Sequence, residues 1–181
     1  MVRVEAPMPE GHQESIMSLV VPSYPPARYT SDQPEVSATL RRGDEPADYD
    51  SHGVIQYHYL ANQKKTAGDY GLYRVDIAPR GGGPGPHFHR AMSEAFFVLS
   101  GTMTLYDGTD WVQAGTNDFL YVPPGGVHGF RNEADEPASV LMLFAPGAPR
   151  EAYFEGFGQL AEMTDDERRE WFIQHDNFFV E

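Results

Sequence analysis

The stretch Gly81–Gly101, GGGPGPHFHRAMSEAFFVLSG, decides the fold of this chain. A turn rich in glycine and proline leads into His87 and His89, which are two positions apart. On a β-strand, residues two positions apart project from the same face, so both imidazoles are expected on one side. Four residues separate His89 from Glu94, which opens an apolar run typical of a returning strand. The stretch therefore predicts a pair of strands with two histidines and one carboxylate.

A second segment, GTNDFLYVPPGGVHGFRN, adds another candidate ligand. A Pro-Pro-Gly-Gly turn precedes a predicted strand on which His128, Phe130 and Asn132 share a face. Three imidazoles and one carboxylate suit Fe, Ni, Mn, Co or Zn. A lone histidine on a strand would be read as a structural or surface residue, but the ordered set of four favours a metal site. We expect one divalent metal ion with these ligands: His87, His89, Glu94 and His128.

The pattern around both segments is that of an all-β fold. In Gly71–Ala78, residues Tyr73, Val75 and Ile77 alternate with polar side chains, as in a half-buried strand. Turn signals separate the short predicted strands, and this spacing is typical of a sandwich or barrel. The predicted strands are Val54–Leu60, Gly71–Ala78, Glu94–Leu99, Thr102–Tyr106, Asp110–Gln113, Asp118–Val122, Val127–Arg131 and Ser139–Phe144.

The two ends of the chain differ from this middle part. Residues 1–50 are rich in proline, serine and charge, with short apolar stretches at Ile16–Val21 and Val36–Leu40. They could form a partly disordered tail, or an arm with edge strands that packs on the barrel or on a partner subunit. The barrel is assigned to 51–147 and a C-terminal segment to 148–181. A helix is expected near 164–175, where Thr164 is followed by three acidic residues.

Composition excludes several function classes. The formal net charge is −14, which disfavours binding to nucleic acid or to anionic membranes. No apolar run approaches the length of a membrane span. There is no cysteine, so disulfides and thiolate ligands are excluded. Met1–Glu14 lacks the pattern of a signal peptide, and a cytoplasmic location is expected.

The two histidine segments resemble the motifs of the cupin superfamily. The first family motif is G-x5-H-x-H-x(3–4)-E-x6-G, and the matching positions are Gly81, His87, His89, Glu94 and Gly101. The second is G-x5-P-x-G-x2-H-x3-N, and the matching positions are Pro123, Gly125, His128 and Asn132. Seven residues rather than five separate Gly115 from Pro123, which is expected to alter the turn before the strand. The resemblance extends over roughly 54–145 and implies a jelly-roll barrel, the double-stranded β-helix.

The resemblance also implies a function. Small cupins with this ligand set are similar to quercetinase-type dioxygenases, in which the residue at the position of Glu94 acts as a base toward the substrate hydroxyl. The expected substrate is an aromatic, polyphenolic or enolisable small molecule, with dioxygen as co-substrate. Two alternatives stay open: a non-redox polyketide cyclase or isomerase, and a non-catalytic small-molecule-binding cupin. The resemblance further implies a homodimer that exchanges N-terminal strands.

Strand parity gives candidates for the substrate pocket. If the ligands face the barrel interior, the other inward side chains would line the cavity beside them. Such a wall is apolar and aromatic and suits a flat ligand, although any small barrel is filled with similar residues. The predicted substrate-binding residues are Tyr73, Val75, Phe96, Met103, Phe130, Met142 and Phe144.

Overall fold

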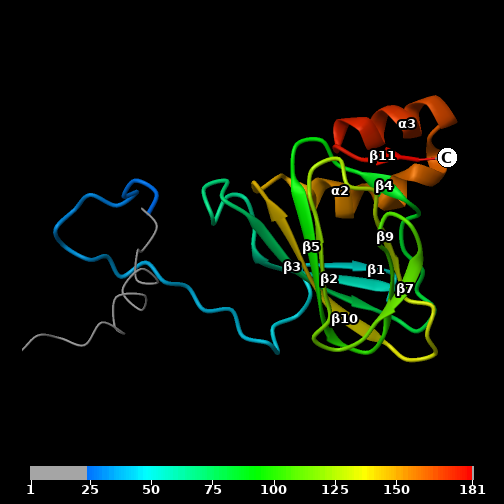
Figure 1. The fold of residues 1–181 in the computed structure, drawn as a ribbon, viewed down its shortest axis with the longest axis horizontal. Coiled ribbons are helices and arrows are strands. Elements are labelled where there is room, and N and C mark those ends of the chain that lie inside the picture. The colour runs from blue at the N-terminus through cyan, green and yellow to red at the C-terminus, as the bar shows by residue number, and fades with distance from the viewer. Residues whose placement is uncertain (1–23, 181) are drawn as a thin grey trace, which may run out of the picture. The chain divides into compact units, whose positions relative to one another are not determined.

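The computed structural model describes residues 24–180 of the chain (Figure 1). The chain divides into two units, Met1–Leu40 and Arg41–Glu181. In the described part of the first unit, residues 24–40, there is no helix or strand. The apolar stretch Val36–Leu40 therefore forms no edge strand, and Ile16–Val21 lies outside the described residues.

The largest sheet of the second unit has six antiparallel strands in the order β1-β2-β3-β10-β5-β8. Strand β10 pairs with β3 on one side and with β5 on the other, and both of these strands lie far from it in the sequence. The sheet therefore brings the two halves of the unit together. The strand bounds are β1 Tyr49–Ser51, β2 Ile55–Ala61, β3 Gly71–Ile77, β5 Ser93–Ser100, β8 Phe119–Val122 and β10 Ala138–Ala145.

The remaining strands form two smaller sheets. The order of the three-stranded sheet is β7-β6-β9, with β6 Met103–Tyr106, β7 Trp111–Ala114 and β9 Gly129–Arg131. The two-stranded sheet pairs β4, His87–Phe88, with β11, Phe178–Phe179. An isolated bridge between His87 and His128 connects these two small sheets.

The hydrophobic core of the described residues lies between the layers. Strands β3 and β10 alternate buried and half-buried residues along their whole length, as period-two patterning requires. Their buried faces meet in register, with Val140 opposite Val75 and Met142 opposite Tyr73. Met103 of β6 joins the same core from the second layer. The predicted all-β jelly-roll fold is confirmed, but the sheets remain separate and do not close into one continuous barrel.

The predicted C-terminal helix is present as α3, Asp165–Gln174. The side chain of Thr164 accepts a hydrogen bond from the Glu167 backbone N–H, and the Glu167 carboxylate accepts one from the Thr164 N–H. This capping box satisfies two backbone donors that a helix start otherwise leaves unpaired. Two preceding elements were not predicted: helix α2, Arg150–Gly156, and the 3₁₀ helix η2, Phe157–Glu162. Figure 1 shows these elements in orange and red beside β4 and β11.

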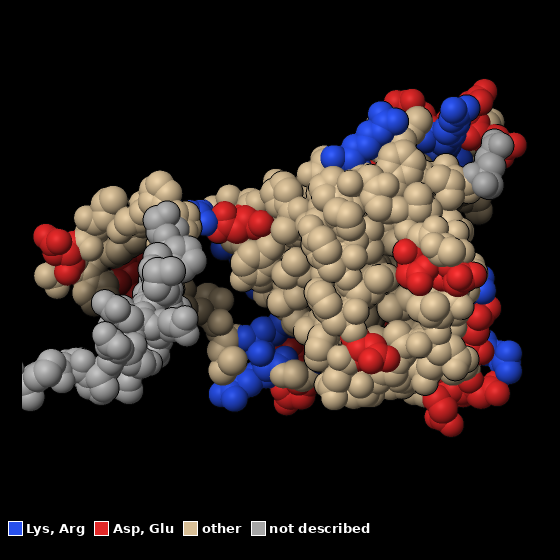
Figure 2. Space-filling model, viewed as in Figure 1, with Lys and Arg blue, Asp and Glu red and all other residues tan. Residues whose placement is uncertain are grey.

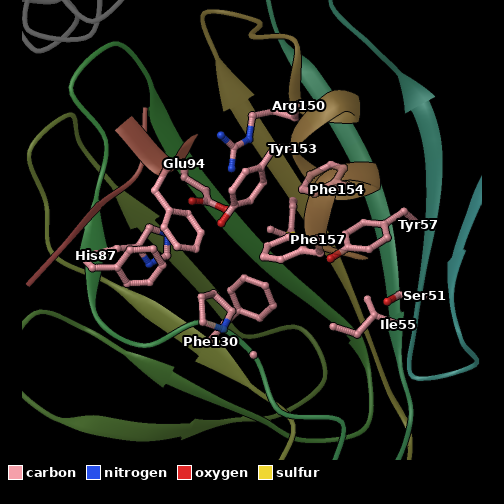
Figure 3. A pocket seen from close by; sticks show the side chains of 15 residues that line it. Ser51, Ile55, Tyr57, His87, Glu94, Phe130, Arg150, Tyr153, Phe154 and Phe157 are labelled. Carbon is pink, nitrogen blue, oxygen red and sulfur yellow. The ribbon is translucent and has the colours of Figure 1, made fainter. Parts of the chain in front are cut away.

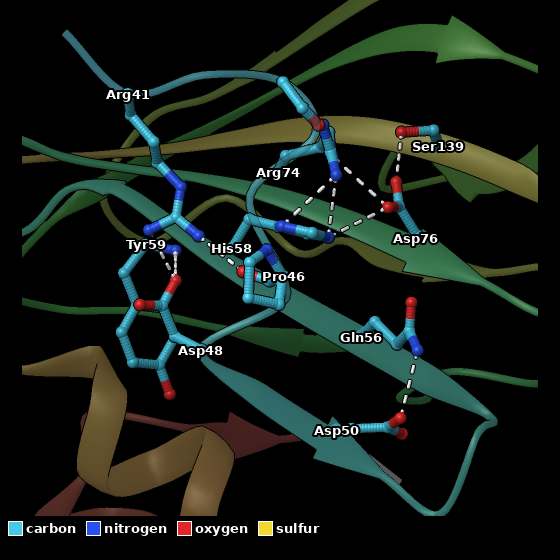
Figure 4. A network of polar contacts seen from close by, with 11 residues as sticks. Arg41, Pro46, Asp48, Asp50, Gln56, His58, Tyr59, Arg74, Asp76 and Ser139 are labelled. Carbon is cyan, nitrogen blue, oxygen red and sulfur yellow. Dashed lines mark hydrogen bonds and ion pairs between the residues drawn. The ribbon is translucent and has the colours of Figure 1, made fainter.

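A polar network covers the outer face of β2 and β3 (Figure 4). His58 Nε2 lies 3.1 Å from Asp76 Oδ2 and 2.8 Å from an Arg74 nitrogen. Arg41 pairs with Asp48 at 2.8 Å, and Asp48 accepts a hydrogen bond from the Tyr59 backbone. His58 is thus a structural histidine held by charged neighbours, and it is separate from the four candidate ligands.

The surface of the folded unit carries scattered charge. On the face in Figure 2, acidic and basic side chains lie beside one another at the top and along the edges of the unit, around a broad area over the strands that carries few charges. Two large apolar side chains of the edge strand β8 are exposed, Phe119 and Tyr121. Within residues 24–180, every helix falls short of the length and apolarity that crossing a membrane would require.

Candidate metal centre and its cavity

The four predicted ligands meet at one end of the core. His87 begins β4, His89 follows that strand directly, Glu94 lies on β5 and His128 immediately precedes β9. The backbones of His87 and His128 exchange two hydrogen bonds of 2.8 Å, which sets the two imidazoles side by side. The short connection between His89 and Glu94 leads into β5, which brings the carboxylate to the same place.

The side chains of this cluster are buried and close together. One nitrogen or oxygen from each of the four residues lies within 4.8 Å of the others. Glu94 Oε2 is 2.8 Å from His128 Nε2 and 3.0 Å from His89 Nε2. Two ligands bound about 2.1 Å from one ion at a right angle would lie about 3 Å apart. The spacing of these donors therefore fits a single metal ion.

The second nitrogen of each imidazole is fixed by a backbone carbonyl. His87 Nδ1 lies 3.0 Å from Gly85 O, His128 Nδ1 lies 3.0 Å from Gly126 O, and His89 Nδ1 contacts Asp176 O. A carbonyl only accepts, so each Nδ1 donates its hydrogen, and the Nε2 lone pairs of neutral imidazoles then point into the cluster. Lone pairs that face a carboxylate need a proton or a cation between them, which again fits a metal ion.

The protonation states in the cluster follow from burial and from these contacts. Burial alone would raise the pKa of Glu94, but its contacts with His128 and His89 outweigh burial and hold the pKa below its ordinary value. Burial, with His128 nearby, lowers the pKa of His87 to about 3. Burial also disfavours charge on His128, yet its contact with Glu94 raises its pKa. At neutral pH the carboxylate is ionised and His87 is neutral, as ligands must be.

A cavity of about 380 Å³ opens beside the cluster (Figure 3). Its volume falls within the range of small-molecule sites. Glu94 and His87 contribute to its wall, whereas His89 and His128 do not. Most of its lining is aromatic or aliphatic, and the full set is Ser51, Ile55, Tyr57, Gly83, Pro84, His87, Glu94, Phe130, Met142, Arg150, Tyr153, Phe154, Phe157, Phe172 and Phe179.

The seven predicted substrate-binding residues lie in two different settings, and their role stays a prediction. Phe130 and Met142 line the cavity. The other five are buried in the hydrophobic core and do not contribute to the cavity wall: Tyr73, Val75, Phe96, Met103 and Phe144. Their inward direction was predicted from strand parity, but parity does not separate side chains that fill the core from those that border a void.

The C-terminal segment supplies much of the wall that the sequence prediction missed. Other unpredicted positions in the wall are Ser51, Ile55, Gly83 and Pro84. Arg150, Tyr153 and Phe154 come from α2, and Phe157 begins η2. Phe154 stacks on Tyr57 of β2 with ring centroids 4.3 Å apart, which docks α2 against the large sheet. The aromatic spacing in the sequence REAYFEGF was the available signal, because it places Tyr153, Phe154 and Phe157 on neighbouring turns of a helix.

Comparison with known proteins identifies the class that this fold and site define. The profile of the Cupin domain matches residues 73–144. An uncharacterized protein of Streptomyces coelicolor is 31% identical over 88 residues, which are 49% of this chain and 79% of that protein. The chain therefore belongs to the cupin superfamily.

Two further proteins are similar to this chain over part of its length. Quercetin 2,3-dioxygenase of Bacillus subtilis is 31% identical over 91 residues, which are 50% of this chain. The chain spans about a quarter of that enzyme, 26% of its length. The crystal structure of the polyketide cyclase RemF from Streptomyces resistomycificus superposes with a TM-score of 0.52 at 22% identity, covering 62% of this chain and 81% of that one. The superposition supports the shared fold.

Proposed function

We propose that this chain is a metal-dependent dioxygenase that acts on an aromatic, polyphenolic or enolisable small molecule. The observation that carries the proposal is the meeting of the His87, His89, Glu94, His128 cluster with an aromatic-walled cavity. The 31% identity to a quercetin dioxygenase over half of the chain also supports this proposal. An iron, nickel, manganese, cobalt or zinc ion would polarise an oxygen of the substrate and hold it in place.

Glu94 is placed to handle the proton of the substrate. Among residues 24–180 it is the one carboxylate in the wall of the cavity, and it also belongs to the ligand cluster. An ionised carboxylate at this position can accept a proton from a substrate hydroxyl within hydrogen-bonding reach. In the proposed reaction, Glu94 takes the proton of the substrate hydroxyl and leaves an electron-rich enolate for reaction with dioxygen.

The cavity wall would orient a flat substrate and exclude water. Tyr57, Phe154 and Phe130 present ring faces and edges to the cavity (Figure 3). Planar ligands gain from offset or edge-on contacts with such rings in addition to the burial of apolar area. A dry wall also strengthens every electrostatic contact between the substrate and the cluster.

Oxygen uptake tests the proposal. Protein loaded separately with Fe, Ni, Mn, Co and Zn would be assayed with quercetin and with an enolisable polyketone. We expect oxygen consumption with at least one metal, and a loss of about 100-fold or more in Glu94→Gln. The matched control is Glu155→Gln, because Glu155 lies outside the cavity and bonds to Tyr59 at the surface.

Other outcomes would assign the site differently. Turnover of the polyketone under nitrogen, with no oxygen consumed, would replace the proposal with a cyclase or isomerase. Tight binding without any turnover would indicate a small-molecule-binding module. The expected homodimer and cytoplasmic location stay predictions, and analytical ultracentrifugation would check the first of them.

A further inference from the structure

Arg150 is a buried cation that the proposed reaction does not use. Its side chain lines the cavity although the residue is only 4% exposed. One terminal nitrogen donates to the carbonyl of His175 at 2.8 Å, but the buried Nε has no hydrogen-bond partner. Buried polar groups without partners are rare in folded proteins and need a reason.

The charge of Arg150 also lacks a close counter-ion. Within the described part of the chain no carboxylate forms an ion pair with it, and its positive charge lies over aromatic rings instead. The guanidinium carbon is 4.1 Å from the ring centroid of Tyr153 and 4.9 Å from that of Phe144. Cation–π contacts recover only part of the cost of burying a charge.

The guanidinium and the metal cluster border the same space. Arg150, Glu94 and His87 all line the cavity, and Figure 3 shows the guanidinium beside Tyr153 on the Glu94 side. Glu94 and Asp176 act on this charge only through space, and neither forms an ion pair with it within the described residues. When Glu94 serves a metal ion, its negative charge is already engaged. An anionic group of a ligand in the cavity could then pair with Arg150 directly.

We propose that Arg150 binds a carboxylate of the substrate, so that the substrate is a planar aromatic or enolisable acid. A carboxylate pairs with guanidinium through parallel charge-assisted hydrogen bonds and would supply an acceptor for Nε. The aromatic wall would hold the ring, and the hydroxyl would face Glu94. This assignment rests on the proposed function for the position of the metal, and it narrows the substrate class.

A pair of probes that differ in one charge tests the assignment. Binding of 4-hydroxy-2-naphthoate and of its methyl ester to the metal-loaded protein would be measured by isothermal titration calorimetry. The hydroxyl and carboxylate of this probe are too far apart to chelate one ion together. We expect the acid to bind at least about 30-fold more tightly than the ester. In Arg150→Gln this preference should disappear, and Arg150→Lys should retain part of it.

A second arginine serves as the control. Arg131 also stacks on an aromatic ring, with its guanidinium carbon 3.8 Å from the centroid of Trp111, but it does not line the cavity. Arg131→Gln should leave the preference for the acid unchanged. Circular dichroism and metal content would show that Arg150→Gln is folded and loaded, and Arg150→Lys provides the comparison if it is not.

The outcomes separate this assignment from the proposed function. Equal affinity for acid and ester, an unchanged preference in Arg150→Gln, or no measurable binding of the acid would overturn the carboxylate site. A preference that depends on Arg150, in a protein that never consumes oxygen, would support the site and reject the dioxygenase.

Discussion

The ligand region around β4, β5 and β9 and the C-terminal segment from α2 to β11 both border the cavity, but their residues reach it by different routes. His87 and Glu94 lie on strands, and His89 and His128 lie directly beside strand ends, so local strand geometry directs these side chains. Arg150, Tyr153 and Phe154 arrive on a helix whose position depends on docking against β2. The first region thus sets the chemistry locally, and the second sets the shape of the cavity through tertiary packing.

Among the substitutions we predict, truncation of Phe154 should change stability the most. We expect it to disturb the packing of the C-terminal segment and to leave the metal ligands in place. Phe154 is 2% exposed and stacks on Tyr57. Phe154→Ala should lower the free energy of unfolding by about 3–5 kcal/mol, measured by urea denaturation of the metal-free protein. Phe119→Ala, at a site that is 63% exposed on β8, should change it by less than about 0.5 kcal/mol. Equal losses in the two variants would contradict docking of α2 by this ring.

Removal of a ligand side chain should weaken metal binding in the ligand region. His128 is fully buried and its Nε2 faces the cluster. His128→Ala should weaken metal binding by at least about 100-fold, measured by competition with a chromophoric chelator. His58→Ala removes a buried histidine of the outer network and should retain one metal per chain. Retention of stoichiometric metal in His128→Ala would reject the proposed ligand set.

Asp176 connects the two regions, and its substitution should have an intermediate effect. Its carboxylate accepts hydrogen bonds from the backbone N–H groups of Arg90 and Ala91 at 3.0 and 2.9 Å, and its carbonyl holds His89 Nδ1. Asp176→Ala should weaken metal affinity by about 10-fold because the carbonyl is no longer held in place. Asp176→Asn keeps one acceptor oxygen and should weaken it less. Unchanged affinity in Asp176→Ala would show that the two regions are independent.

The smallest expected effect concerns α3. Thr164→Ala removes the side-chain cap of that helix and should cost about 1 kcal/mol of unfolding free energy, while Thr164→Ser should be close to neutral. Both variants should bind metal as the unmodified chain does, because α3 contributes no ligand. A loss of metal affinity in Thr164→Ala would mean that α3 supports the cluster through β11.

The strands and the fold class were predictable because alternation is a local property. Residues such as Val75 and Ile77 show their burial in the sequence itself, and the spacing of His87, His89 and Glu94 needs only strand geometry. The cavity was not predictable in the same way. Phe96 and Phe130 both point inward, yet Phe96 fills the core and Phe130 borders the void, because the difference depends on which side chains pack opposite.

Helix α2 was missed for a related reason. It spans only Arg150–Gly156, no side chain caps its start, and its buried face is defined by contact with β2. A helix this short is not stable alone, so its sequence carries little of the information that fixes it. Arg150 would have been read from the sequence as a surface cation, as most arginines are.

The hydrogen bond from His89 to Asp176 joins residues 87 positions apart. Contacts between such distant parts of a chain form slowly, because a long loop must close before they are gained. A refolding chain will therefore form the local turn from His89 to Glu94 early and orient the His89 ring only when β11 pairs with β4. High metal affinity should then appear in the last kinetic phase, so that metal capture reports the completion of folding.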